Sequence, residues 1–119
     1  MNYCILSGLA NELYNSIAMS LKKQFDEKNP LCKVTFSLAK GMTNSAFRVN
    51  LAGDFNDWDT ENIPMKKMRN GEYTASVDLK KGREYEFKYL IDGSGWINDK
   101  EADKYVQNRF QTENSVVIV

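Results

Sequence analysis

From residue 31 to the end of the chain, apolar and polar residues alternate in short stretches, and turn-forming sequences separate these stretches. A period of two places successive side chains on opposite faces of an extended chain, so the pattern is typical of half-buried β-strands. In one stretch Phe47, Val49 and Leu51 share a face. The stretches that predict strands are residues 33–38, 47–52, 72–79 and 84–91, and the apolar run 115–119 predicts a closing strand.

The connections between these stretches carry residues that favour tight turns. Asn70-Gly71, Lys80–Arg83 and Asp92-Gly93 each fit a hairpin turn. About seven short strands with frequent turns and no intervening helix are typical of an immunoglobulin-like antiparallel β-sandwich. The sequence therefore predicts an all-β domain over residues 31–119, with the motif-bearing segments in loops at the strand ends.

Residues 1–30 have a different pattern and are predicted to form a separate N-terminal helical extension. Apolar residues recur at every fourth position, which favours one apolar ridge along a helix over residues 9–27. Such a ridge needs a covering surface: the sandwich, a protein partner or a second copy of the chain. A second interpretation is that the true start is Met19, with residues 1–18 upstream of it. The ridge consists of Leu9, Leu13, Ile17, Leu21 and Phe25.

Composition excludes several classes of function. Sixteen Lys and Arg balance sixteen Asp and Glu, so the basic excess that drives nucleic-acid binding is missing. The absence of His removes the commonest acid/base group and zinc ligand. No stretch approaches the roughly 20 apolar residues of a membrane span. Cys4 and Cys32 are expected to be reduced thiols, and without a signal-peptide pattern we expect a cytoplasmic protein.

Three polar segments carry aromatic side chains and are the candidate binding loops. Residues 53–59 follow a predicted strand and include Trp58, and residues 91–99 include Trp96 just after a turn. Residues 108–114 precede the last strand and supply an aromatic ring, a hydroxyl and amides. The acidic segment 54–61 is not expected to bind calcium, because Trp58 stands where an oxygen ligand is needed. We therefore expect no metal and no cofactor.

These segments resemble a known family. Three segments in this order are similar to the glycogen- and starch-binding modules of the isoamylase early-set group: Val49–Trp58, Tyr85–Gly93 with Trp96 close behind, and Asn114–Val117. That group includes the glycogen-binding domain of the AMP-activated kinase β subunit and short bacterial proteins that consist of this module alone. The resemblance covers about residues 31–119 and implies binding of α-1,4-linked glucan without hydrolysis.

The resemblance also implies which residues contact sugar. Trp58 and Trp96 match two aromatic platforms that stack on glucose rings in the family, and Lys88 and Asn114 match residues that hydrogen-bond to sugar hydroxyls. Thr112 matches a further contact position, and Phe110 aligns with a bulky apolar residue of different identity. Here Gln111 replaces a usual Gly and Lys100 a common Pro, and Ser94-Gly95 lengthens the second loop by one residue relative to the kinase subunit.

The chemistry of glucose supports the same set of residues. A pyranose ring has apolar C–H faces and a rim of hydroxyls, so its site needs flat aromatic rings with polar groups at their edges. Each residue also has a structural interpretation. Trp58 and Trp96 could close the ends of the sandwich, Lys88 could pair with Glu84 or Glu86, and Asn114 could satisfy a turn. Phe55 is assigned to the core.

Two other functions are weighed against glucan binding. A glycosidase needs two convergent carboxylates, which Asp57, Asp59, Asp92 and Asp99 could supply. In the enzymes of the group, however, the module precedes a separate catalytic barrel, so catalysis is not expected. The stronger alternative is a protein-interaction or regulatory module that keeps the fold without binding glucan.

Overall fold

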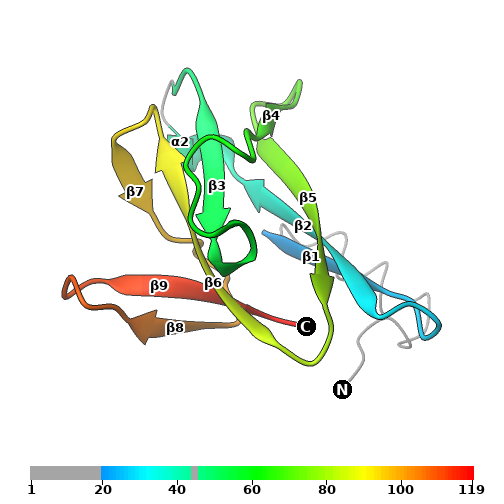
Figure 1. Ribbon diagram of the computed structural model, residues 1–119. Helices are drawn as coiled ribbons and strands as arrows, with labels where there is room; N and C mark the ends of the chain where they lie inside the picture. Colours follow the sequence, from blue (N-terminus) through cyan, green and yellow to red (C-terminus); the bar gives the residue numbers. More distant parts are fainter. Residues whose placement is uncertain (1–19, 44–45) are drawn as a thin grey trace.

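The computed structural model describes residues 20–43 and 46–119, and within them the chain forms two antiparallel sheets (Figure 1). The first sheet has the strand order β1-β2-β5-β4 and the second the order β3-β6-β9-β8, with β7 paired to β6. The predicted all-β sandwich is confirmed. No helix of the described residues is long and apolar enough to cross a membrane.

The strands follow the predicted pattern closely where that pattern is long. The first sheet contains β1 (Leu21–Phe25), β2 (Leu31–Leu38), β5 (Tyr73–Lys80) and β4 (Lys66–Lys67). The second contains β3 (Val49–Gly53), β6 (Glu84–Ile91), β7 (Gly95–Ile97), β8 (Lys104–Gln107) and β9 (Glu113–Ile118). Among the described residues, short helices lie in two connections: α2 (Lys40–Thr43) and the 3-10 turn η2 (Asp54–Asn56).

The core lies between the two sheets and is centred on aromatic rings. Phe36 of β2 contacts Phe87 of β6 with ring centroids 4.9 Å apart, and Phe55 of η2 with centroids 5.6 Å apart. Phe36 and Phe87 are fully buried. The assignment of Phe55 to the core is confirmed by its packing against this cluster, so η2 is fixed to the sandwich at the point where the first candidate loop begins.

The predicted N-terminal helix is wrong for the part of it that the structure describes. Leu21–Phe25 forms strand β1 and pairs antiparallel with β2, Leu21 opposite Phe36 and Phe25 opposite Cys32. A spacing of four residues is also a multiple of two, so Leu21 and Phe25 share one face of a strand as well as of a helix. The predicted boundary between residues 30 and 31 is therefore wrong, because β1 belongs to the sandwich. The rest of the ridge, Leu9, Leu13 and Ile17, lies outside the described residues.

Leu21 gives a direct test of β1. Its side chain is buried in the core, so we expect Leu21→Ala to lower the free energy of unfolding by about 2 kcal/mol through the cavity it leaves. Urea unfolding of the full chain measures this value. The matched control is Lys22→Ala on the exposed face of the same strand. Equal stability of Leu21→Ala and the unmodified chain would contradict the assignment of β1 to the core.

Three smaller predictions are corrected. The pattern predicts that Phe47 shares one face of a strand with Val49, but Phe47 precedes β3 and is 94% exposed. The turn at Lys80–Arg83 was expected to close a hairpin, but β5 and β6 belong to different sheets, so this turn crosses between them. Trp96 was expected in a loop and lies on β7 instead.

Candidate functional site

Asn56 holds the backbone of the loop after β3 in the turn that carries Trp58. The Asn56 Oδ1 accepts a hydrogen bond from Gly53 N at 3.0 Å, and the Trp58 N–H donates to the Gly53 carbonyl at 2.9 Å. Asp57 and Trp58 then have left-handed φ angles of 55° and 58°, which are uncommon for residues with a Cβ. The loop thus holds a strained conformation at the aromatic residue.

Asp54 fixes the Trp58 side chain. The indole Nε1 donates to Asp54 Oδ1 at 3.0 Å, and Asp54 Oδ2 accepts the backbone N–H of Glu86 at 2.8 Å. Glu86 belongs to β6, the strand next to β3. The carboxylate therefore ties the indole to the sheet, which limits the rotation of the ring.

Strand β7 presents Trp96 on the outer face of the second sheet. Trp96 lies opposite Leu90 of β6, on the face of that strand that points away from Phe87 and Tyr89 in the core. The turn that precedes it has positive φ at Asp92 and Gly93, as in a type I′ hairpin. The Trp96 side chain is 44% exposed.

The structure brings the two indoles into contact. The ring centroids of Trp58 and Trp96 are 6.3 Å apart, and the ring planes meet at 65°. Trp58 is partly buried, whereas Trp96 leaves much of its surface to solvent. Trp58 and Trp96 lie 38 positions apart in the chain, yet their rings together form one aromatic surface. We call this surface the Trp pair.

Lys88 lies on the same outer face as Trp96. It stands two residues before Leu90 on β6 and pairs with Ala52 of β3. Its predicted ion-pair partners are engaged elsewhere: Glu84 pairs with Lys104 at 2.6 Å, and Glu86 accepts from Asn114. Within the described residues Lys88 makes no ion pair, so its ammonium is available to a ligand.

Asn114 also points to the outer face, but it is part of a hydrogen-bonded network. Its Nδ2 donates to Glu86 Oε1 at 2.9 Å, and its Oδ1 accepts from Asn108 Nδ2 at 2.9 Å. The side chain is 9% exposed. An amide has a second donor and a second lone pair, so Asn114 keeps limited capacity for a ligand while it mainly positions Glu86 and Asn108.

Phe110 and Thr112 lie in the connection between β8 and β9. Asn108 organises this loop, because its Oδ1 accepts the backbone N–H groups of Phe110 and Thr112 and its Nδ2 donates to the Thr112 hydroxyl. Phe110 is 72% exposed, and the guanidinium of Arg109 lies 5.1 Å from its ring centre. Both predicted residues are thus solvent-facing, and within the part of the chain that the structure describes neither shares a hydrogen bond or ring contact with the Trp pair.

The residues that position the site are not among those predicted from the sequence. Asp54, Glu86 and Asn108 hold Trp58, Asn114 and Thr112 in place. The signal for Asn108 was present, since an Asn before a turn often accepts backbone N–H groups two residues on. The pairing of Asp54 with β6 depends on tertiary structure and has no such local signal.

The arrangement combines a flat apolar surface with polar groups near it. The Trp pair offers two ring faces, Lys88 offers hydrogen-bond donors, and Glu86, Asn114 and Thr112 offer further polar groups on the same sheet and its end. Such a set suits a ligand with apolar faces and a hydroxylated rim.

Comparison with known families agrees with this chemistry. A family model described as the glycogen recognition site of AMP-activated protein kinase matches residues 42–119. The match includes every candidate site residue named above, and it begins inside α2, so β1 and β2 precede it. No curated protein matches the sequence.

Proposed function

The chain belongs to the family of the glycogen recognition site of AMP-activated protein kinase, and we propose that it binds α-1,4-linked glucan on the surface formed by Trp58 and Trp96. Lys88 and Asn114 contribute hydrogen bonds to the sugar hydroxyls, and Thr112 and Phe110 make contacts at the end of the sheet. The ligand is glycogen, starch or a maltooligosaccharide.

The contact between Trp58 and Trp96 is the observation that carries this proposal. Two indoles with their planes at 65° suit a ligand whose sugar rings turn relative to one another, as they do along the helical curve of an α-1,4-linked chain. A flat ribbon would fit two coplanar rings better. Lys88 on the same face, which forms no ion pair among the residues that the structure describes, adds the donor that such a surface needs.

The expected affinity follows from the area of the two rings. Stacking one glucose removes roughly 60–80 Å² of apolar surface from water, which at about 25 cal/mol per Å² gives about 1.5–2 kcal/mol for each Trp. Hydrogen bonds to hydroxyls largely replace bonds to water and add about 0.5–1.5 kcal/mol each. After the costs of association we expect micromolar to millimolar affinity.

The proposed role is non-catalytic. Of the four carboxylates that could form a glycosidase pair, Asp99 is buried, Asp92 accepts the backbone N–H groups of Phe47 and Arg48, and Asp59 accepts those of Glu61 and Asn62. Three of the four thus have structural partners, which supports binding without turnover.

We expect Lys88→Ala to weaken maltoheptaose binding by about 1 kcal/mol, roughly fivefold, because a solvated ammonium already bonds to water. Isothermal titration calorimetry measures the change. Lys104→Ala is the matched control, because Lys104 is also a surface lysine of this sheet but pairs with Glu84. An equal loss in both variants would show a general charge effect and would contradict a direct contact from Lys88.

A further inference from the structure

A second surface lies where the β2–β3, β4–β5 and β6–β7 connections meet, at the upper end of Figure 1. Lys40 of α2 packs on Gly71 of the β4–β5 connection, where an added Cβ would lie 2.7 Å from Lys40 Cδ. The backbone N–H of Arg48 donates to Asp92 Oδ1 of the β6–β7 turn at 2.9 Å. The three connections therefore form one continuous surface, which we call the basic end.

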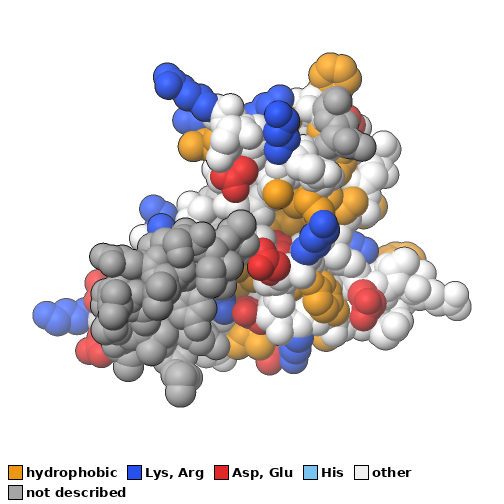
Figure 2. Space-filling model, turned by 180° about the vertical axis from the view of Figure 1, so that it is seen from behind, with side chains coloured by type: hydrophobic (Ala, Val, Ile, Leu, Met, Phe, Trp, Pro, Cys, Tyr) orange, Lys and Arg blue, Asp and Glu red, His pale blue; other side chains and the backbone are white. Residues whose placement is uncertain are grey.

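The basic end concentrates positive charge on a chain whose formal net charge is zero. Two acidic side chains at this end form hydrogen bonds and, within the described residues, no ion pair with its cations. Asp92 accepts the backbone N–H groups of Phe47 and Arg48, and Glu72 accepts from the Asn70 amide. Lys and Arg side chains gather at this end in Figure 2. Five cations at the basic end form no ion pair within the described residues: Lys40, Arg48, Lys66, Lys67 and Arg69.

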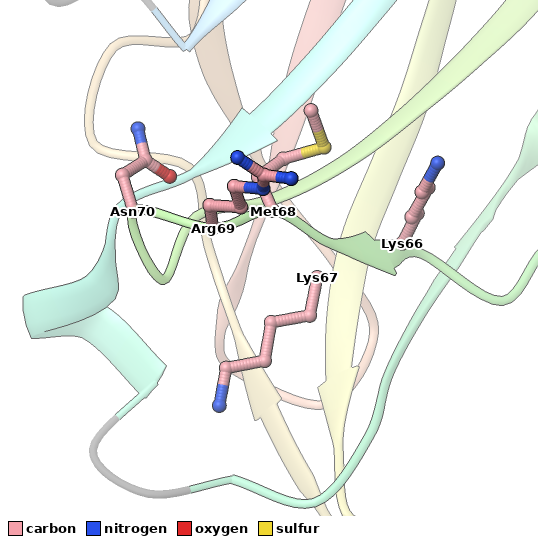
Figure 3. A pocket seen from close by; sticks show the side chains of 5 residues that line it. All are labelled: Lys66, Lys67, Met68, Arg69 and Asn70. Carbon is pink, nitrogen blue, oxygen red and sulfur yellow. The ribbon is translucent and has the colours of Figure 1, made fainter.

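These cations are spread out and do not converge on one point. Residues Lys66–Asn70 line an open hollow of about 500 Å³, and Figure 3 shows Lys66 and Lys67 leaving β4 in opposite directions. Adjacent strand positions must point to opposite sides, so both ammonium groups cannot hold the same small anion. This geometry favours an extended anionic partner over a single phosphate.

The basic end also exposes apolar side chains. Phe47 is 94% exposed and Met68 is 43% exposed, and Met68 lines the hollow together with the apolar stems of Lys and Arg. Phe, Met and Arg are enriched at the centres of protein interfaces. A partner that fits this surface therefore carries both carboxylates and apolar side chains.

We propose that the basic end docks an acidic protein segment that carries apolar anchors, with one anchor seated in the hollow lined by Lys66–Asn70. The segment runs across Lys67 and Arg69 and reaches the exposed Phe47. This site is distinct from the Trp pair and does not depend on glucan binding. A chain with both surfaces joins a glucan to a protein.

The test is an NMR titration of the full ¹⁵N-labelled chain with a synthetic peptide in which glutamates alternate with leucine and phenylalanine. We expect amide shifts at Phe47, Arg48 and Lys66–Asn70 that diminish as salt is added. A peptide with lysines in place of the glutamates is expected to cause none. Absence of shifts at Lys66–Asn70 with the acidic peptide would overturn the proposal.

Charge reversal provides the matched variants. Lys67→Glu combined with Arg69→Glu is expected to weaken peptide binding about tenfold or more. The control, Lys22→Glu with Lys33→Glu, reverses two exposed lysines of the first sheet and is expected to retain binding. Equal loss in both double variants would overturn the proposal, and circular dichroism shows whether each variant is folded. Inorganic phosphate, an oligothymidylate and phosphatidylserine vesicles are titrated in the same way. If one of them causes stronger shifts at these amides than the acidic peptide does, the proposal of an acidic protein segment is overturned.

Discussion

Replacing Asp99 with alanine is expected to lower the free energy of unfolding by about 3–4 kcal/mol, because three donors then lose their acceptor inside the protein. The carboxylate is 1% exposed and accepts from Tyr89 Oη at 2.6 Å, from the Glu101 N–H at 2.7 Å and from the Ser20 hydroxyl. Ser20 immediately precedes β1 and Tyr89 lies on β6, so the loss affects both sheets.

Differential scanning calorimetry measures this effect as a fall in Tm of roughly 10–20 °C. Burial, together with the Asp99 charge, raises the pKa of the Tyr89 hydroxyl well above its ordinary value, so Tyr89 is a hydrogen-bond donor to Asp99 at neutral pH. Asp99→Asn keeps an oxygen acceptor and is expected to cost less. Lys100→Ala, next to it and exposed, is expected to change Tm little. A Tm for Asp99→Ala equal to that of Lys100→Ala would contradict the structural role of Asp99.

Removing both indoles is expected to abolish measurable glucan binding. Trp58→Ala or Trp96→Ala alone should weaken binding about 10- to 30-fold through lost apolar contact. The double variant should lose about 3 kcal/mol or more, roughly a hundredfold or more. Since the ring centroids are only 6.3 Å apart, the losses from the two single variants need not add.

Calorimetric titration with maltoheptaose measures these affinities. Trp96→Phe keeps a flat ring and is expected to retain part of the binding that Trp96→Ala loses. Folding should survive in the single variants, because Trp96 is largely exposed and Trp58 lies in a surface loop. Unchanged affinity in the double variant would contradict the location of the site, even if glucan binds elsewhere on the chain.

The fold could be predicted where the alternating pattern runs for eight residues. Strands β5 and β6 have that length, and each carries apolar residues at alternate positions. Strands β4, β7 and β8 have four residues or fewer, too short for a period to be recognised. Strand β1 was mistaken for a helix because Leu21 and Phe25 fit both periods. All five residues of β3 are buried, although their sequence predicts one exposed face.

The candidate site could be predicted only in its exposed parts. Trp58 and Trp96 could be identified because aromatic residues are unusual in polar segments, and Lys88 because it alternates with core residues of β6. The network of Asp54, Glu86, Asn108 and Asn114 depends on β6 having both β3 and β9 as neighbours. These pairings are properties of the tertiary fold and could not be predicted from local sequence.

The most direct test of the central claim is an NMR titration with maltoheptaose that follows the indole N–H signals of the two Trp residues in the chain. Both signals are expected to shift together and to saturate, since Trp58 and Trp96 form one surface. Cellohexaose, the β-1,4-linked counterpart, is expected to cause much smaller shifts. If millimolar maltoheptaose moves neither indole signal, glucan binding by this surface is contradicted and the fold serves another ligand.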